Sequence, residues 1–146
     1  MSFLSRVLLT GTTASLSSAG LLGVLAKAEG RDPVQPVNAT SHWLHGEIAG
    51  HSKVLNVRYT LVGFASHYAA SVFWSTVFQR LRQARPDRSP VPDALGVTAL
   101  AALVDYALVP KRLTPGWESV VSPASIAIAY AALTLSFLAT CPPRGR

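Results

Sequence analysis

The chain has 146 residues, of which 49% are hydrophobic and 14% are charged. A soluble domain typically carries about 25% charged residues, so this composition excludes a disordered chain and argues against a water-soluble domain. Thirteen lysines and arginines against seven acids give a net charge of +6. Because these cations flank apolar segments and do not form a basic surface interleaved with aromatic residues, we expect no nucleic-acid partner.

The first apolar segment, residues 7–26, has about the length of ~20 residues that crosses a bilayer. Small residues recur every four positions along it and form a stripe that lets a partner helix approach closely; they are Gly11, Ser15, Ala19 and Gly23. A secretory signal peptide is the competing interpretation, because residues 26–28 read Ala-Lys-Ala and fit a cleavage site. We favour a retained span, since the segment exceeds the ~7–15 apolar residues of a signal peptide and further apolar segments follow.

A polar stretch follows this span. Two prolines within residues 31–36 predict extended backbone there. Residues 38–48 predict a short helix, with Asn38 or Ser41 as its N-cap. Trp43 would let this helix lie at the membrane surface, as an interfacial helix between the first and second spans.

The second apolar segment, residues 59–79, ends in a run of cations. His67 lies on the face that carries small residues at four-residue spacing, so we expect it to point into the protein. Four arginines follow in a short stretch: Arg80, Arg82, Arg85 and Arg88. We interpret this cluster as a loop that sets the topology, and the alternative is a binding site for anionic lipid headgroups.

The third and fourth apolar segments complete the pattern. Residues 94–109 are rich in alanine, contain Asp105 and end at a proline. Residues 120–140 follow a Thr-Pro-Gly-Trp turn, in which proline and glycine suit the two central positions. The sequence therefore predicts an all-α, polytopic membrane protein. We expect one domain over residues 1–146, a transmembrane four-helix bundle with a short interfacial helix.

The distribution of charge predicts the orientation of this bundle. An even number of spans places both termini on one side, and the dense arginine cluster lies on that same side. Since lysine and arginine are enriched in cytoplasmic loops, we expect both termini to be cytoplasmic. Four aromatic residues would then form a belt at the outer interface; they are Trp43, Tyr59, Tyr106 and Trp117.

Two ionisable residues within the spans are candidates for a polar site. His67 and Asp105 lie toward the outer side, where they could form a proton relay or part of a small-ligand site. The alternative is that Asp105 pairs with Arg58, Lys111 or Arg112 near the interface, while His67 forms a hydrogen bond between helices. We favour the alternative, because Asp105 lies close enough to the surface to stay hydrated.

Two further histidines form a second candidate site. His42 and His45 are three residues apart and share a helical face. Together with Glu47 or His67 they could ligate a divalent metal or haem. The chain contains no His-Glu-x-x-His motif, and interfacial histidines usually serve as amphipathic side chains. We therefore expect no metal and no other cofactor.

Two stretches of the chain carry a family resemblance. They are residues 38–46, which read Asn-Ala-Thr-Ser-His-Trp-Leu-His-Gly, and Asp105-Tyr106 together with residues 110–118. Both resemble short segments of small, uncharacterised bacterial inner-membrane proteins with four predicted spans. The resemblance implies a retained first span and a bacterial inner membrane, and it implies no catalytic role.

These observations lead to a functional expectation. The chain lacks a Gly-rich phosphate loop, a Gly-x-Ser-x-Gly elbow and a pair of close intramembrane carboxylates, so we expect a non-enzymatic protein. The leading interpretation is an accessory or scaffold component in the lipid bilayer, packed against other membrane-protein subunits or a second copy of itself. The main alternative is a ligand-, metal- or proton-handling protein that uses His67, Asp105, His42 and His45. A third interpretation is an enzyme with its active site at the outer interface.

Overall fold

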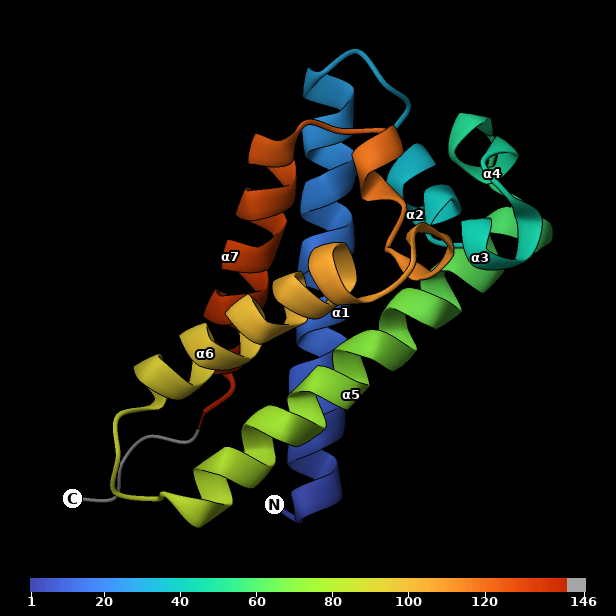
Figure 1. Ribbon diagram of the computed structural model, residues 1–146. Coiled ribbons are helices and arrows are strands. Elements are labelled where there is room, and N and C mark those ends of the chain that lie inside the picture. The colour runs from blue at the N-terminus through green and yellow to red at the C-terminus, as the bar shows by residue number, and fades with distance from the viewer. Residues whose placement is uncertain (142–146) are drawn as a thin grey trace.

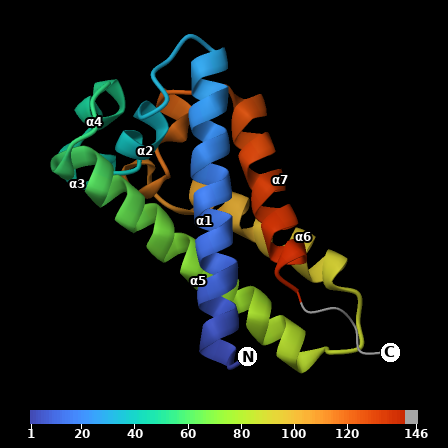
Figure 2. The ribbon, with the colours of Figure 1, turned by 180° about the vertical axis from the view of Figure 1, so that it is seen from behind.

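The computed structural model describes residues 1–141, and this part of the chain contains helices and loops but no strand. Four long helices account for most of it: α1 (Phe3–Ala28), α5 (Val62–Ala84), α6 (Pro90–Leu103) and α7 (Pro123–Ala139). α1 packs against α5 and α7, and α6 packs against the same two helices. α1 runs along the middle of the molecule, with α5 crossing it obliquely (Figures 1 and 2). The predicted all-α class is therefore confirmed for the described residues.

Serine caps fix where three of the long helices begin. Ser2 Oγ accepts a hydrogen bond from the Ser5 amide at 3.1 Å, and Ser122 Oγ accepts one from Ser125 at 3.3 Å. Ser89 Oγ accepts from the Val91 amide at 3.4 Å, ahead of a proline in the first turn of α6. Proline is tolerated there because the first-turn N–H groups have no partner within the helix. As a result α6 begins at Pro90, one turn earlier than the predicted start at residue 94.

The polar stretch after α1 folds differently from the prediction. A single helix over residues 38–48 is wrong, because three short helices form in its place: α2 (Gln35–Ala39), α3 (His42–His45) and α4 (Ile48–His51). Extended backbone through residue 36 is also wrong, since Pro36 lies in the first turn of α2. Gly46 explains the break after α3, because its φ of +75° is a conformation that L side chains rarely adopt.

These short helices pack beside a second irregular segment. Residues 110–121 contain two 3₁₀ turns, η3 (Lys111–Leu113) and η4 (Trp117–Ser119), and contact α2 and α3. We call α2, α3, α4 and residues 110–121 the capping layer. Buried amides hold it together: Gln35 Nε2 donates to the Gly50 carbonyl at 2.8 Å, and Asn38 Oδ1 accepts from Thr60 at 2.6 Å.

The two ends of the molecule differ in kind. The capping layer lies at the end where α1 finishes and α7 begins (Figures 1 and 2). The start of α1, the end of α7 and the connection between α5 and α6 lie at the other end, which we call the arginine end. Two π-helical turns adjoin the capped end, η1 (Val57–Leu61) before α5 and η2 (Val104–Leu108) after α6.

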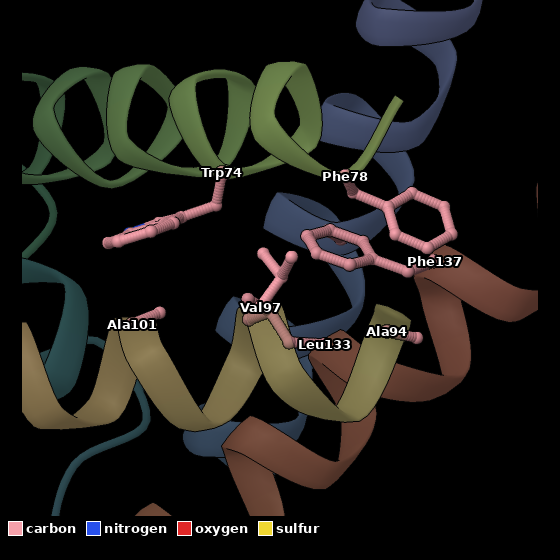
Figure 3. Packing of buried hydrophobic residues seen from close by; sticks show 8 residues of the cluster. Trp74, Phe78, Ala94, Val97, Ala101, Leu133 and Phe137 are labelled. Carbon is pink, nitrogen blue, oxygen red and sulfur yellow. The ribbon is translucent and has the colours of Figure 1, made fainter. Parts of the chain in front are cut away.

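An apolar cluster fills the space between α5, α6 and α7. Phe78 stacks on Phe137 with ring centroids 5.0 Å apart. Trp74 and Phe78 point from α5 toward Val97 on α6 and Leu133 on α7 (Figure 3). Burial of aromatic and branched side chains stabilises each by about 1.5–3 kcal/mol relative to exposure. This cluster therefore joins three of the long helices.

Hydroxyl groups connect the long helices elsewhere. Four hydroxyl pairs bridge neighbouring helices or their ends within 3.1 Å; they are Thr10–Thr140, Thr12–Tyr68, Ser17–Ser136 and Thr98–Thr134. Large apolar side chains instead point outward along all four helices. Helix contacts through small and hydroxyl residues are typical of membrane proteins.

Two helical stretches of the described residues, α1 and Pro90–Leu108, are long and apolar enough to cross a membrane. α7 is also apolar but shorter. The predicted segments 7–26 and 59–79 coincide with helical backbone, as does 94–109 up to residue 108, and residues 120–140 coincide with a short loop and α7. The structure thus supports a helical protein with two candidate spans.

Candidate functional site

The candidate polar site lies beneath the capping layer, where α1, α5 and α7 meet residues 104–117. His67 is buried on the face of α5 that packs against α1. Its Nε2 atom lies 3.0 Å from Ser18 Oγ and 3.2 Å from the Ser15 carbonyl oxygen, both on α1. The histidine therefore forms the interhelical hydrogen bond that the favoured sequence interpretation describes.

Trp117 separates His67 from the other half of this site. The His67 ring meets the Trp117 indole edge-on, with centroids 5.5 Å apart. The indole N–H donates to Thr40 Oγ1 at 3.1 Å. The residue before Trp117 is Gly116, and the structure requires glycine there. Its φ of +78° is a conformation that L side chains rarely adopt, and a Cβ at this residue would collide with His42. The expected place of Trp117 in an exposed aromatic belt is wrong, since the side chain is buried.

Asp105 finds a partner that the sequence argument did not consider. Its Oδ2 accepts a hydrogen bond of 2.5 Å from the Tyr130 hydroxyl on α7. Tyr130 in turn lies 6.0 Å from Trp117 between ring centroids. Within the described residues Asp105 forms no ion pair, so the expected pairing with an interfacial cation is wrong.

The candidate relay between His67 and Asp105 is not assembled. The order of contacts is His67, Trp117, Tyr130 and Asp105, and the indole N–H in the middle is already bonded to Thr40. An indole N–H only donates, so it cannot accept a proton and pass it on. The structure therefore brings the two residues into one cluster without a hydrogen-bonded path between them.

The other two histidines have separate environments. His42 Nδ1 lies 2.9 Å from the Ala39 carbonyl oxygen, and Nε2 lies 3.0 Å from that of Lys111. His45 meets the Tyr59 ring edge-on at 5.3 Å. Across residues 1–141, no group of three or more His, Cys, Asp or Glu side chains is placed to hold a metal ion. The geometry thus offers no support for the metal-binding alternative.

The small-residue stripe of α1 faces two different neighbours. A Cβ added to Gly11 would lie 2.9 Å from the Val72 backbone of α5. Ser15 is fully buried near His67, whereas Ala19 is only partly buried. Gly23 faces the loop before α2, where a Cβ would lie 3.1 Å from the Pro33 carbonyl oxygen. The small residues of this stripe therefore allow close approach of both α5 and the loop before α2.

The arginine cluster divides into two groups. Arg82 Nη1 lies 2.9 Å from buried Asp93 Oδ2, and its Nη2 donates to two carbonyl oxygens of the turn over residues 86–88. The Arg80 guanidinium lies 4.5 Å from the centre of the Phe3 ring. Arg85 and Arg88 are exposed. The first two side chains fasten α5 to α6 and α1, and the second two face outward.

Sequence reasoning missed Glu29, the residue that joins the end of α1 to the start of α7. Its carboxylate accepts hydrogen bonds from the Ser122 amide at 2.8 Å and from the Ser122 and Ser125 hydroxyls. The Ser125 and Ser122 hydrogen bonds lower the pKa of Glu29 below its ordinary value. The sequence feature behind this link is an acid that lies 93 residues before the serine cap of α7. No local motif encodes a contact over such a separation.

An apolar cavity of about 670 Å³ opens beside the capping layer. Val34 and Val37 line it from the α2 side, and Val54, Leu55 and Phe64 line the opposite side. Asp32 and Lys53 are its charged lining residues. The cavity is separate from the polar cluster, because its lining includes none of the four residues of that cluster, which are His67, Trp117, Tyr130 and Asp105.

The fold and the site together define a class, a helical protein with membrane-crossing potential and an internally bonded polar cluster. No family model matches the chain, and neither a curated protein nor a solved structure matches it. The resemblance to small bacterial inner-membrane proteins therefore stays a prediction.

Proposed function

We propose that this protein is an integral membrane protein whose four long helices all cross the bilayer as a four-helix bundle. Each of the four carries an exposed large apolar side chain; these are Leu16, Phe73, Leu100 and Leu135, with exposed fractions of 56%, 59%, 45% and 66%. Large apolar side chains that face outward on every long helix are expected when lipid is the solvent.

The central position of α1 supports a retained first span. α1 packs against both α5 and α7; its Ala14 belongs to the apolar cluster described above, and its Leu22 belongs to a further buried cluster with Trp117. Cleavage after residue 28 would remove the helix that these neighbours share. A secretory signal peptide has no such role in the mature fold.

The proposed orientation follows from the arginine end. Four arginines and two aspartates lie between residues 80 and 93, close to the start of α1. Under the bias of lysine and arginine toward the cytoplasm, both termini lie inside and the capping layer lies outside. A bacterial inner membrane is the proposed location.

Within this membrane we propose a non-enzymatic role, as an accessory or scaffold subunit that packs against other membrane proteins. The observation that carries this proposal is the internal bonding of the polar cluster. His67, Trp117 and Asp105 each bond to a residue of the same chain. Side chains that bond to one another within the chain hold the fold together, whereas a reaction site needs groups directed at a substrate.

A photo-crosslinking experiment in native membranes tests the scaffold role. A photoreactive residue at Leu135, which is exposed on α7, is expected to crosslink to a second polypeptide. The matched control is Phe137, which is fully buried on the same helix and should give no crosslink between chains. Crosslinks from Leu135 to lipid alone, combined with a monomer after mild detergent extraction, would contradict the proposal.

A further inference from the structure

A groove runs between α5 and α6 at the arginine end. Its volume is about 380 Å³. Apolar side chains from both helices form its floor; they are Val77, Leu81, Val97 and Leu100. An aliphatic chain is the kind of occupant that such a floor can shield from water or accept from a bilayer.

Gly96 keeps one side of the groove open. It is exposed on α6, and a Cβ built on it would meet no atom within 4 Å. Glycine is the least favourable helix residue after proline, at about 1 kcal/mol relative to alanine. The missing side chain at this position leaves room beside Val97 and Leu100.

Two arginines line the same groove near its polar end. Arg85 has about half of its side chain exposed, and Arg88 is exposed in the turn that follows α5. Asp93 also lines the groove; its Oδ2 is already paired with Arg82 at 2.9 Å and its Oδ1 lies 3.8 Å from Arg85. Asp87 is the other acid of this segment and has its own interaction within the protein.

The charge and shape of the groove together select its occupant. The charged residues that line the groove are Arg85, Arg88 and Asp93, and Asp93 is already paired with Arg82, so the mouth carries an excess of positive charge above an apolar floor. A phospholipid with a net negative headgroup can place its anion at the positive mouth and its aliphatic chain on the apolar floor. A free phosphate ion would leave the floor empty, and a zwitterionic lipid would leave the positive excess uncompensated.

We propose that the α5–α6 groove binds one acyl chain of an anionic phospholipid, with the lipid phosphate held by Arg85 and Arg88. This inference rests on the proposed membrane location, since the lipid reaches the groove from the surrounding leaflet. The bound lipid would extend the contact between α5 and α6 at an end where no capping layer covers them.

Lipid titration of the full chain in neutral detergent tests the proposal. Phosphatidylglycerol is expected to raise the Tm of the wild type, whereas phosphatidylcholine and inorganic phosphate are not. Replacing both arginines, as Arg85→Gln with Arg88→Gln, should weaken the apparent affinity for phosphatidylglycerol by about 25-fold, since each cation near a lipid surface contributes about fivefold. The Asp93–Arg82 pair stays intact in this variant, so the fold is expected to be retained.

A second variant tests the acyl-chain part of the site. Gly96→Leu should fill the groove and remove the rise in Tm on addition of phosphatidylglycerol. The matched control is Gly20→Leu, because Gly20 is also exposed on a helix and a Cβ there meets no atom within 4 Å. The lipid-induced change in Tm is compared within each variant, since replacing a helical glycine alters stability by itself.

The outcomes separate this site from the membrane proposal. An equal response to both lipids, or an unchanged response in Gly96→Leu, overturns the lipid site. Extraction of native membranes with alkaline carbonate tests the membrane location independently. Retention in the pellet with no preference for the anionic lipid overturns the groove proposal alone, whereas release into the supernatant overturns both.

Discussion

The inward and outward faces of the long helices differ in the polar groups that they carry. Inside, hydroxyl groups and His67 bond across helix contacts, as between Thr98 and Thr134 at 2.7 Å. Outside, leucines and a phenylalanine are exposed on the helices, although large apolar side chains also pack inside, between α5, α6 and α7. A helix of a soluble protein instead turns polar residues toward water. This difference supports the proposal that lipid surrounds the long helices.

The largest effect is expected from breaking the buried ion pair between Arg82 and Asp93. Arg82→Gln would leave Asp93 buried with only a distant contact to Arg85. Removing one partner of a buried pair typically costs about 3–5 kcal/mol. Unfolding in mixed micelles measures the loss, and exposed Arg85→Gln, the control, should change stability by less than about 1 kcal/mol. Equal effects of the two substitutions would show that the inner pair does not hold α5 to α6.

A charge placed on the outer face should have the next largest effect. Leu16 is exposed midway along α1, and Leu16→Arg should cost about 2.5–3.5 kcal/mol of insertion free energy if this position lies in lipid. The fraction of protein that resists carbonate extraction measures the change. In water the same substitution would be harmless, so undiminished folding with full solubility would contradict the contrast between the two faces.

Overpacking the inner face sharpens the comparison further. Gly11→Leu would force its side chain against Val72, where even a Cβ has only 2.9 Å to the backbone. Such overpacking typically costs about 1–3 kcal/mol. Gly20→Leu on the outer face of the same helix should leave the Tm equal or higher. The two variants are compared by thermal unfolding, and a reversed order would mean that α1 does not pack as described.

The smallest effect is expected at the link between α1 and α7. Because the pKa of Glu29 is lower in the folded protein than in the unfolded chain, its contribution is present above the unfolded value and is lost as pH falls through the folded value. Glu29→Gln should lower the Tm slightly at neutral pH and remove this part of the acid-induced loss. Thermal unfolding across the acidic range measures both changes; an unaltered acid dependence in Glu29→Gln would contradict the role of this carboxylate.

The sequence was informative about the helices because each long helix contains a run free of Asp, Glu, Lys and Arg. Hydropathy alone identifies such runs, and the predicted 7–26 lies within α1. The sequence predicts the capping layer poorly, since Pro36 lies in a helix that begins earlier than expected, Gly46 ends another, and the positions of the short helices depend on packing against residues 110–121.

The residues of the candidate site could be predicted from the sequence, but the hydrogen-bond partners of these residues could not. The inward face of His67 follows from helical spacing, whereas its partners lie 49 and 52 residues away on α1. Asp105 was recognised as unusual in an apolar segment. Its bond to Tyr130 depends on how α6 and α7 pack together, which local patterns do not encode.

Cysteine labelling in sealed vesicles tests the central claim most directly. In a Cys141→Ser background, single cysteines at Leu16, Phe73, Leu100 and Leu135 place one reporter on the outer face of each long helix. A water-soluble, membrane-impermeant maleimide should leave all four unlabelled, while cysteines at Lys53 and Arg88 should react from opposite sides of the membrane. Labelling of these four outer-face positions in intact vesicles would contradict the account, because those side chains would then face water.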